Sequence, residues 1–285
     1  MTAPLNAFDH AVIAVRDLKA ASRDFERMGF RLTPEAEHEG IGTANRCIMF
    51  PGTYIELLGV TDPQKASTRL IAALADRGDG GIGLAYASAN ADATAAALMD
   101  AGLAIDGPAD LSRPLDLDGE RNVVRFRNIR LPDLPPASIA QFTCHHVTPE
   151  LTRARHEWEL HANGADGLAE IVLSAEEPSQ LRAPYARLFG EARLREAPHG
   201  FVVRLENMAI AVMTPVGIET RLTVKGARNQ PSPPAIAALS IRVKEVDAAG
   251  AMLDAAGPDP IETPHGLILP AGRAHGLALE FISSH

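Results

Sequence analysis

Residues 8–18 read FDHAVIAVRDL, and this stretch decides the fold class. The run from His10 to Val15 is apolar and rich in β-branched residues, which predicts a short buried strand. Asp17 is placed to accept a backbone N–H at the start of a helix. The apolar residues that follow recur at helical spacing as far as Gly29, which predicts the end of the helix.

The unit continues with three predicted strands and then recurs along the chain. These strands cover residues 31–33, 45–50 and 54–60. The same order returns in three further units, which begin near residues 83, 169 and 237. Aligned on their helices, the units place His10 opposite Gly83, Glu170 and Ala238. Because the spacing is irregular, the pattern predicts a duplicated and diverged βαβββ module rather than a solenoid.

Composition excludes several classes of protein. The chain has 285 residues, 46% hydrophobic and 22% charged, which is enough for a large core. A net charge of −9 argues against a nucleic-acid partner. No apolar run approaches the roughly 18 residues of a membrane helix, and the first eight residues lack a secretory pattern. Two distant cysteines, Cys47 and Cys144, indicate free thiols in a reducing compartment, so we expect a cytoplasmic protein without a membrane partner.

Four such modules are expected to pack as two pairs in an α+β fold. Residues 1–147 form the first pair, residues 148–166 a polar connection, and residues 167–285 the second pair. The Pro-containing residues 221–234 are typical of a linker between the third and fourth modules. A homodimer is compatible with this organisation.

The chain resembles the vicinal oxygen chelate superfamily, and within it the glyoxalase-like domain proteins of the glyoxalase, bleomycin-resistance and dioxygenase type. The residues that carry the resemblance are 8–18, 28–30 (MGF), 42–45 (GTAN) and 54–58 (YIELL). It is strong over the N-terminal module and weaker beyond it. The resemblance implies that each pair of modules curves a mixed sheet around a cavity, with helices outside. It also implies that first and fourth strands supply the ligands of a divalent metal.

The resemblance further implies a ligand set in the first pair. His10 occupies the first-strand position and Glu56 the fourth-strand position of the first module, and Glu56 is also the candidate catalytic residue. Gly83, at the first-strand position of the second module, offers no side chain. The third ligand is His145 or His146, only one of which can face the cavity. Polar neighbours favour His145, whereas the Val-Thr-Pro run after His146 is similar to the family, and we predict His146.

Two histidines and one carboxylate predict a catalytic metal site with open positions. Imidazole and carboxylate together suit Zn²⁺, Fe²⁺, Mn²⁺ or Ni²⁺, and three protein ligands leave room for water and substrate. We therefore expect one divalent ion and a metal-dependent enzyme that acts on a small oxygenated metabolite. A lyase, an isomerase and a dioxygenase all remain open. The alternative is a metal-free protein of the same fold that binds or sequesters a small molecule.

The C-terminal pair departs from this ligand pattern. Glu170, Ala238 and Glu280 stand at the corresponding positions, and two carboxylates without a histidine make a poor iron site. The resemblance implies that extradiol dioxygenases keep two histidines and a glutamate in the second pair, so this departure argues against a catechol dioxygenase of the usual layout. We expect a degenerate half that packs against the first. Residues 156–164 (HEWELHANG) are expected either to line the entrance of the cavity or to form a simple cap.

Overall fold

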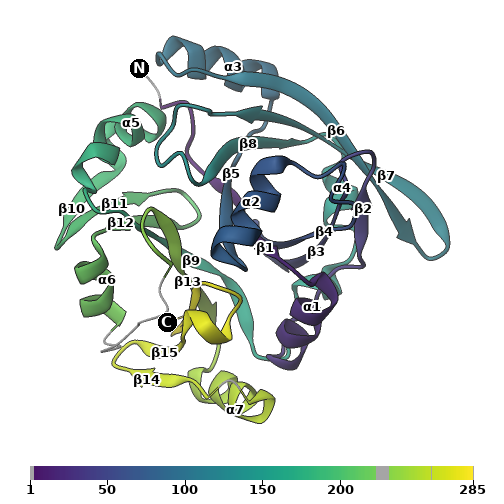
Figure 1. The fold of residues 1–285 in the computed structure, drawn as a ribbon, viewed down its shortest axis with the longest axis vertical. Helices are drawn as coiled ribbons and strands as arrows, with labels where there is room; N and C mark the ends of the chain where they lie inside the picture. Colours follow the sequence, from purple (N-terminus) through teal and green to yellow (C-terminus); the bar gives the residue numbers. More distant parts are fainter. Residues whose placement is uncertain (1–2, 223–230, 258, 285) are drawn as a thin grey trace.

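The computed structural model describes residues 3–222, 231–257 and 259–284, and Figure 1 shows their arrangement. Residues 223–230, which form most of the expected linker at 221–234, lie outside the described residues. Among the described residues, no helix is long and apolar enough to span a membrane.

The N-terminal pair consists of two modules with the predicted order of strand, helix and three strands. The first contains β1 (Phe8–Val15), α1 (Leu18–Arg27), β2 (Ala36–His38), β3 (Thr43–Phe50) and β4 (Thr53–Val60). The second contains β5 (Gly80–Ala87), α3 (Ala91–Asp100), β6 (Asp106–Leu117), β7 (Glu120–Arg130) and β8 (Ala140–His146). Helix α2 (Thr68–Arg77) joins the two modules and was not predicted.

The C-terminal pair repeats the order twice more. Its modules contain β9 (Ala165–Ser174), α5 (Ser179–Phe189), β10 (Leu194–Ala197), β11 (Gly200–Arg204) and β12 (Ala209–Met213), then β13 (Ala235–Val243), α7 (Val246–Ala256), β14 (Ile261–Thr263), β15 (Gly266–Leu269) and β16 (Ala278–Ser283). The shorter connecting elements are α4 (Pro149–Thr152), η1 (His156–Glu159), η2 (Glu191–Arg193), α6 (Pro215–Leu222) and η3 (Ala271–Arg273).

Local signals account for the first helix. The Asp17 carboxylate accepts the Ala20 backbone N–H, as expected of an N-cap, and Gly29 follows the helix with φ +87°.

The second strand was predicted wrongly. Residues 31–33 form no strand, and the strand begins five residues later as β2.

One curved sheet, not closed into a barrel, runs through both pairs in the order β10-β11-β12-β9-β13-β5-β1-β4-β3-β2. The branch β8-β7-β6 leaves it at β5 and the branch β16-β15-β14 leaves it at β13. Antiparallel β1 and β5 join the first two modules, and antiparallel β9 and β13 join the last two. The sheet continues from one pair to the other where Ile236 of β13 pairs with Gly81 of β5. The predicted α+β fold of paired βαβββ modules is confirmed.

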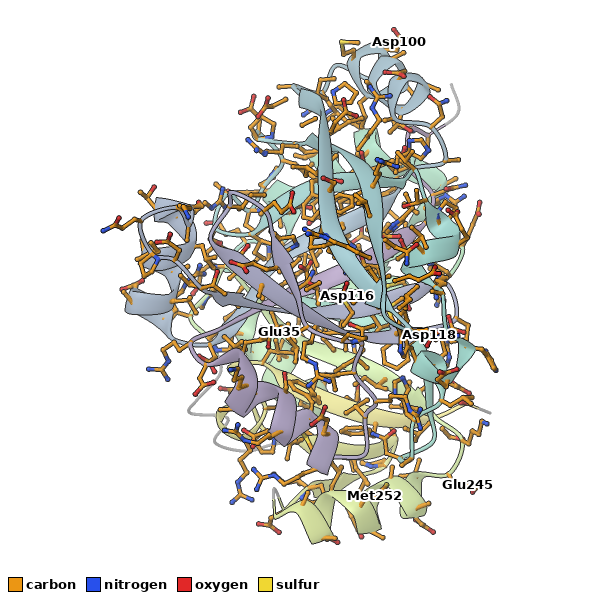
Figure 2. All side chains as sticks on the ribbon, turned by 90° about the vertical axis from the view of Figure 1, so that its right-hand side faces the viewer. Glu35, Asp100, Asp116, Asp118, Glu245 and Met252 are labelled. Atoms are coloured by element: carbon orange, nitrogen blue, oxygen red, sulfur yellow. The ribbon has the colours of Figure 1, made fainter. Side chains whose placement is uncertain are left out.

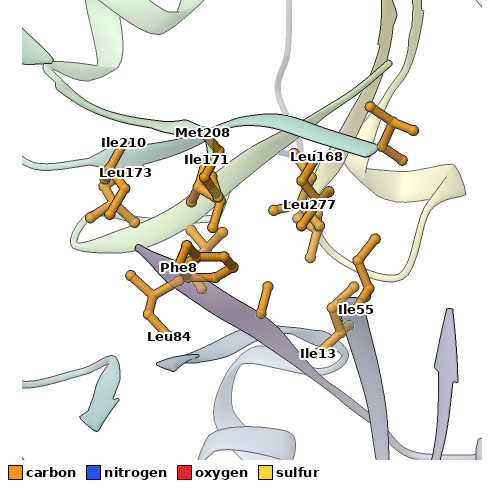
Figure 3. Close-up of a cluster of buried hydrophobic side chains, with 14 of the residues drawn as sticks. Phe8, Ile13, Ile55, Leu84, Leu168, Ile171, Leu173, Met208, Ile210 and Leu277 are labelled. Atoms are coloured by element: carbon orange, nitrogen blue, oxygen red, sulfur yellow. The ribbon is translucent and has the colours of Figure 1, made fainter. Parts of the chain in front are cut away.

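The two faces of β1 separate the core from the concave side of the sheet. Phe8 and Ile13 are fully buried in the main core, where they face Leu168 and Ile171 of the C-terminal pair (Figure 3). Each such side chain contributes about 1.5–3 kcal/mol by leaving water. His10 and Val12, on the opposite face of β1, line a cavity. The packing of the two pairs therefore fixes the strand from which the site is built.

The edge strands of the N-terminal pair curl toward each other. β2 contacts β6, so the long β6–β7 hairpin lies over the concave face. In Figure 2, Asp116 and Asp118 mark the turn end of this hairpin, and Glu35 marks the segment that leads into β2. The same view places Asp100 of α3 and Met252 of α7 at opposite ends of the molecule.

Candidate functional site

The concave face of the N-terminal pair encloses a cavity of about 570 Å³. Its polar lining includes His10, His38, Asn45, Glu56, Arg113 and His146. Its apolar lining includes Val12, Leu58, Leu70, Ile82 and Phe142. This size and this mixture of many apolar and few polar groups are typical of sites for small molecules.

A β-bulge at the start of β1 brings two consecutive side chains to the site. The register against β5 shifts between Phe8 and His10, so Asp9 does not point away from the cavity as strict alternation would require. Asp9 Oδ2 lies 2.6 Å from His10 Nδ1, and both residues are buried. Because a carboxylate can only accept, this contact places a proton on Nδ1, and in the neutral ring the lone pair is then on Nε2.

His10 Nε2 faces Glu56 on β4. The distance from His10 Nε2 to Glu56 Oε2 is 3.5 Å. The Tyr54 ring stacks on the imidazole, with centroids 4.3 Å apart, and Asn45 donates a hydrogen bond of 2.7 Å to Glu56 Oε1. Both candidate ligands are therefore held in place by their neighbours, on two adjacent parallel strands.

This pair fits a divalent ion. A neutral His10 with its proton on Nδ1 presents an acceptor to another acceptor, an arrangement that favours a cation between the two. Two ligands that are each about 2.1 Å from one ion lie about 3.0–3.4 Å apart, which is close to the observed 3.5 Å. The carboxylate behind His10 is the usual outer partner of a metal-bound histidine.

His146 lies in the same cavity but faces a different partner. Its Nε2 is 3.1 Å from both oxygens of Asp9, and its Nδ1 is 3.2 Å from the Thr152 hydroxyl. Asp9, Cys144 and His146 place ligand atoms within 4.8 Å of one another, so they form a second group that could hold a metal. His145 is not among the described residues that line the cavity. A ligand role for His146 stays a prediction.

The protonation of these groups follows from their surroundings. Burial raises the pKa of Asp9, but the hydrogen bonds and charges of His10 and His146 outweigh it, and the pKa falls below its ordinary value. Asp9 is therefore an anion that accepts from both histidines. Burial raises the pKa of the Cys47 thiol to about 12, which makes it a neutral wall of the cavity.

The sequence matches a family model. The model of the glyoxalase-like domain covers residues 8–189, which is more than half of the chain. The chain belongs to the glyoxalase-like domain family. It is thus a member of the vicinal oxygen chelate superfamily, as the N-terminal motifs indicated. No curated protein matches the sequence.

Solved structures share the fold of this glyoxalase-like protein at low sequence identity. A hypothetical protein from Staphylococcus aureus is 13% identical, with a TM-score of 0.69 over 97% of this chain and 98% of that one. A triple mutant of 4-hydroxymandelate synthase from Streptomyces coelicolor is 13% identical, with a TM-score of 0.56 over 99% and 93% of the two chains. A xylose isomerase-like TIM barrel/4-hydroxyphenylpyruvate dioxygenase fusion protein is 11% identical, with a TM-score of 0.56 over 93% of this chain and 41% of that one.

Sequence reasoning missed part of the glyoxalase-like site. His38 lies on β2, with Nδ1 2.8 Å from the Thr43 hydroxyl and Nε2 4.0 Å from Glu56 Oε1. Burial, chiefly, and the charge of Arg113 lower the pKa of His38, and Glu56 opposes them. Because the second strand was placed at residues 31–33, no pattern marked His38 as facing the cavity. The bulge that turns Asp9 inward also leaves no signal in the sequence.

In the C-terminal pair, for which we predicted no metal site, a guanidinium lies between the two carboxylates at the corresponding positions. Arg221 of α6 reaches Glu170 at 2.5 Å and Glu280 at 3.2 Å. Glu280 stands opposite Ser240 in the β13–β16 ladder, as Glu56 stands opposite Val12 in the β1–β4 ladder. The two carboxylates of this half thus share one guanidinium of the same chain, which fits a degenerate half.

The connection between the pairs acts as a cap. His161 is buried, accepts the Arg31 backbone N–H at Nδ1 (3.0 Å) and donates from Nε2 to the Met49 carbonyl (2.8 Å). Trp158 packs in a cluster with Cys47 and Met49. Neither side chain is among the described residues of the cavity lining, so the cap interpretation of residues 156–164 is the better one.

Proposed function

We propose that this glyoxalase-like protein is a divalent-metal-dependent enzyme that acts on a small oxygenated metabolite. The observation that carries the proposal is the pair His10 Nε2 and Glu56 Oε2, 3.5 Å apart in the cavity, with Asp9 behind the imidazole. Two acceptors that face each other form no hydrogen bond, but both can bind a cation placed between them. The two free, buried cysteines fit a reducing compartment and so a cytoplasmic location.

Each residue of the site has a defined task under this proposal. His10 and Glu56 would hold the ion, and His146 is the proposed third ligand. A bound divalent ion would polarise a carbonyl or stabilise an enolate of the substrate. Asp9 fixes the tautomer and orientation of His10, and the Tyr54 ring keeps water from one face of the imidazole. Lyase, isomerase and dioxygenase chemistry all use such a centre.

A second candidate function is metal-free binding or sequestration of a small molecule. The observation in its favour is the direction of His146, whose Nε2 faces Asp9 instead of the space between His10 and Glu56. Gly83 also lines the cavity without a side chain, and Phe142 lines it from β8. Only two ligands then converge on one point, which suits an empty binding cavity.

Metal content distinguishes the two functions. The protein is purified without chelators, loaded in turn with Zn²⁺, Fe²⁺, Mn²⁺ and Ni²⁺, dialysed and assayed by mass spectrometry for metal per chain. We expect close to one ion for the parent, and loss of the ion for His10→Ala and Glu56→Ala without loss of the folded circular dichroism spectrum. His146→Ala should also lose it, whereas the matched control His145→Ala should retain it. A parent that retains none of the four metals would establish the sequestering function instead.

A further inference from the structure

Arg113 is the buried cation of the cavity. It lies on β6, lines the cavity and is 9% exposed. Over residues 3–222, 231–257 and 259–284, no carboxylate forms an ion pair with its guanidinium. The arginines of the neighbouring strand β7 differ, because most of them have an acidic partner. These pairs are Arg121 with Glu39, Arg127 with Asp92, and Arg130 with Asp106.

An unpaired guanidinium is costly to bury, so its place in the cavity calls for an anion. Loss of hydration costs a buried cation several kcal/mol unless an opposite charge meets it. The nitrogens of Arg113 are not sealed in the core, because the side chain borders the open volume of the cavity. A bound anion would supply the missing partner, and a guanidinium can grip a carboxylate through two parallel hydrogen bonds.

The position of Arg113 relative to the other polar groups defines the shape of the ligand. Its strand β6 contacts β2, and Arg113 shares the cavity lining with His38 of β2 and Cys47 of β3. Arg113 makes no ion pair with Glu56, whose carboxylate faces His10 and His38 instead. Apolar side chains of β1, β4, α2, β5 and β8 fill the rest of the lining. A ligand that suits all three regions has one anionic end, an apolar body and an oxygenated centre.

We propose that Arg113 binds the carboxylate of the substrate, and that the cavity therefore takes a small monocarboxylic acid with an apolar body. This rests on the proposed function for the choice of cavity, and it names the class of substrate. A dianionic phosphate suits the cavity less well, because Glu56 in the lining and Asp9 beside His10 already bring negative charge against the single charge of Arg113.

Matched probes test the charge requirement. Isothermal titration calorimetry compares 3-phenylpropanoate with its neutral isostere 3-phenylpropanamide, and uses inorganic phosphate as a competitor. The parent should bind the acid roughly tenfold more tightly than the amide, or better, because a charged hydrogen-bonded pair is lost with the amide. Arg113→Met should remove this preference, Arg113→Lys should retain part of it, and the exposed control Arg121→Met should leave it unchanged. Equal affinity for acid and amide, or no binding of either, would overturn the proposal, as would competition by phosphate.

Two further readouts separate the alternatives. If Arg113 has only a structural role, Arg113→Met should melt well below Arg121→Met in the absence of ligand, and that result would also overturn the proposal. If Arg113 serves to bind a ligand, Arg113→Met should melt at a temperature at least as high as that of the control. Metal retention by Arg113→Met should equal that of the parent. A parent that binds no metal but still prefers the acid would refute the proposed enzyme and leave the carboxylate site standing.

Discussion

Arg221 offers a sharp test of how the C-terminal pair is stabilised. Its guanidinium lies between Glu170 and Glu280, whose side chains are 16% and 5% exposed. Ser240 also donates a hydrogen bond to Glu280. Replacing Arg221 by Met keeps much of the side-chain volume but leaves two poorly hydrated carboxylates close together without a counter-charge.

The cost can be estimated from the burial of the three groups. Removing one partner of a buried ion pair costs about 3–5 kcal/mol. Arg221 is 26% exposed and Glu280 keeps its bond to Ser240, so the lower end of that range applies. At about 2–4 °C per kcal/mol for a chain of this size, Arg221→Met should lower the melting temperature by about 6–12 °C.

Differential scanning calorimetry of four proteins tests this reasoning. The control Arg121→Met breaks a pair whose side chains are 70% and 65% exposed, and should change stability by about 0–1 kcal/mol. The triple variant Arg221→Met, Glu170→Gln, Glu280→Gln should recover most of the loss, because no uncompensated charge remains. If Arg221→Met melts with the control, or if the triple variant melts no higher than Arg221→Met, charge compensation is not what Arg221 supplies.

Two further predictions concern the N-terminal pair and its cap. Burial is the main cause that lowers the pKa of His161, and the hydrogen bond to the Met49 carbonyl opposes it. The neutral ring therefore stabilises the fold above about pH 6.5, and this stabilisation declines as the pH falls below that value. The unfolding free energy in urea should therefore drop less between about pH 8 and about pH 5.5 for His161→Gln than for the parent, and equal drops would contradict this. Gly42 has φ +69°, and a Cβ there would lie 2.5 Å from the Asp62 carbonyl oxygen, so Gly42→Ala should cost at least about 2 kcal/mol in the same urea assay. Gly52→Ala, at φ +79° in open space, should cost about 1 kcal/mol, and a Gly42→Ala variant of equal stability would show that the chain relaxes there.

Local signals explain which elements were predictable. Asp17 and Gly29 act within a few residues of the helix that they bound, so the sequence alone located α1. β6 was missed because its polar and Pro-containing residues show no alternation, although pairing with β7 makes it a strand. Arg113 was missed with it. Long-range pairing also decides the bulge at Asp9, and no residue pattern within β1 reports it.

The two halves of the chain compensate their buried carboxylates in different ways. In each pair, strands that come together at the concave face carry acidic side chains away from bulk water, and such charges need a partner. The C-terminal pair supplies its own cation, Arg221, from a helix. In the N-terminal pair Asp9 is met by two histidines, while Glu56 has the Asn45 amide and faces His10 across 3.5 Å. A half that already contains its cation has no need of an ion. The metal assay should therefore saturate at one ion per chain, and a second ion that survives Glu56→Ala and is lost with Glu280→Gln would disprove this division of roles.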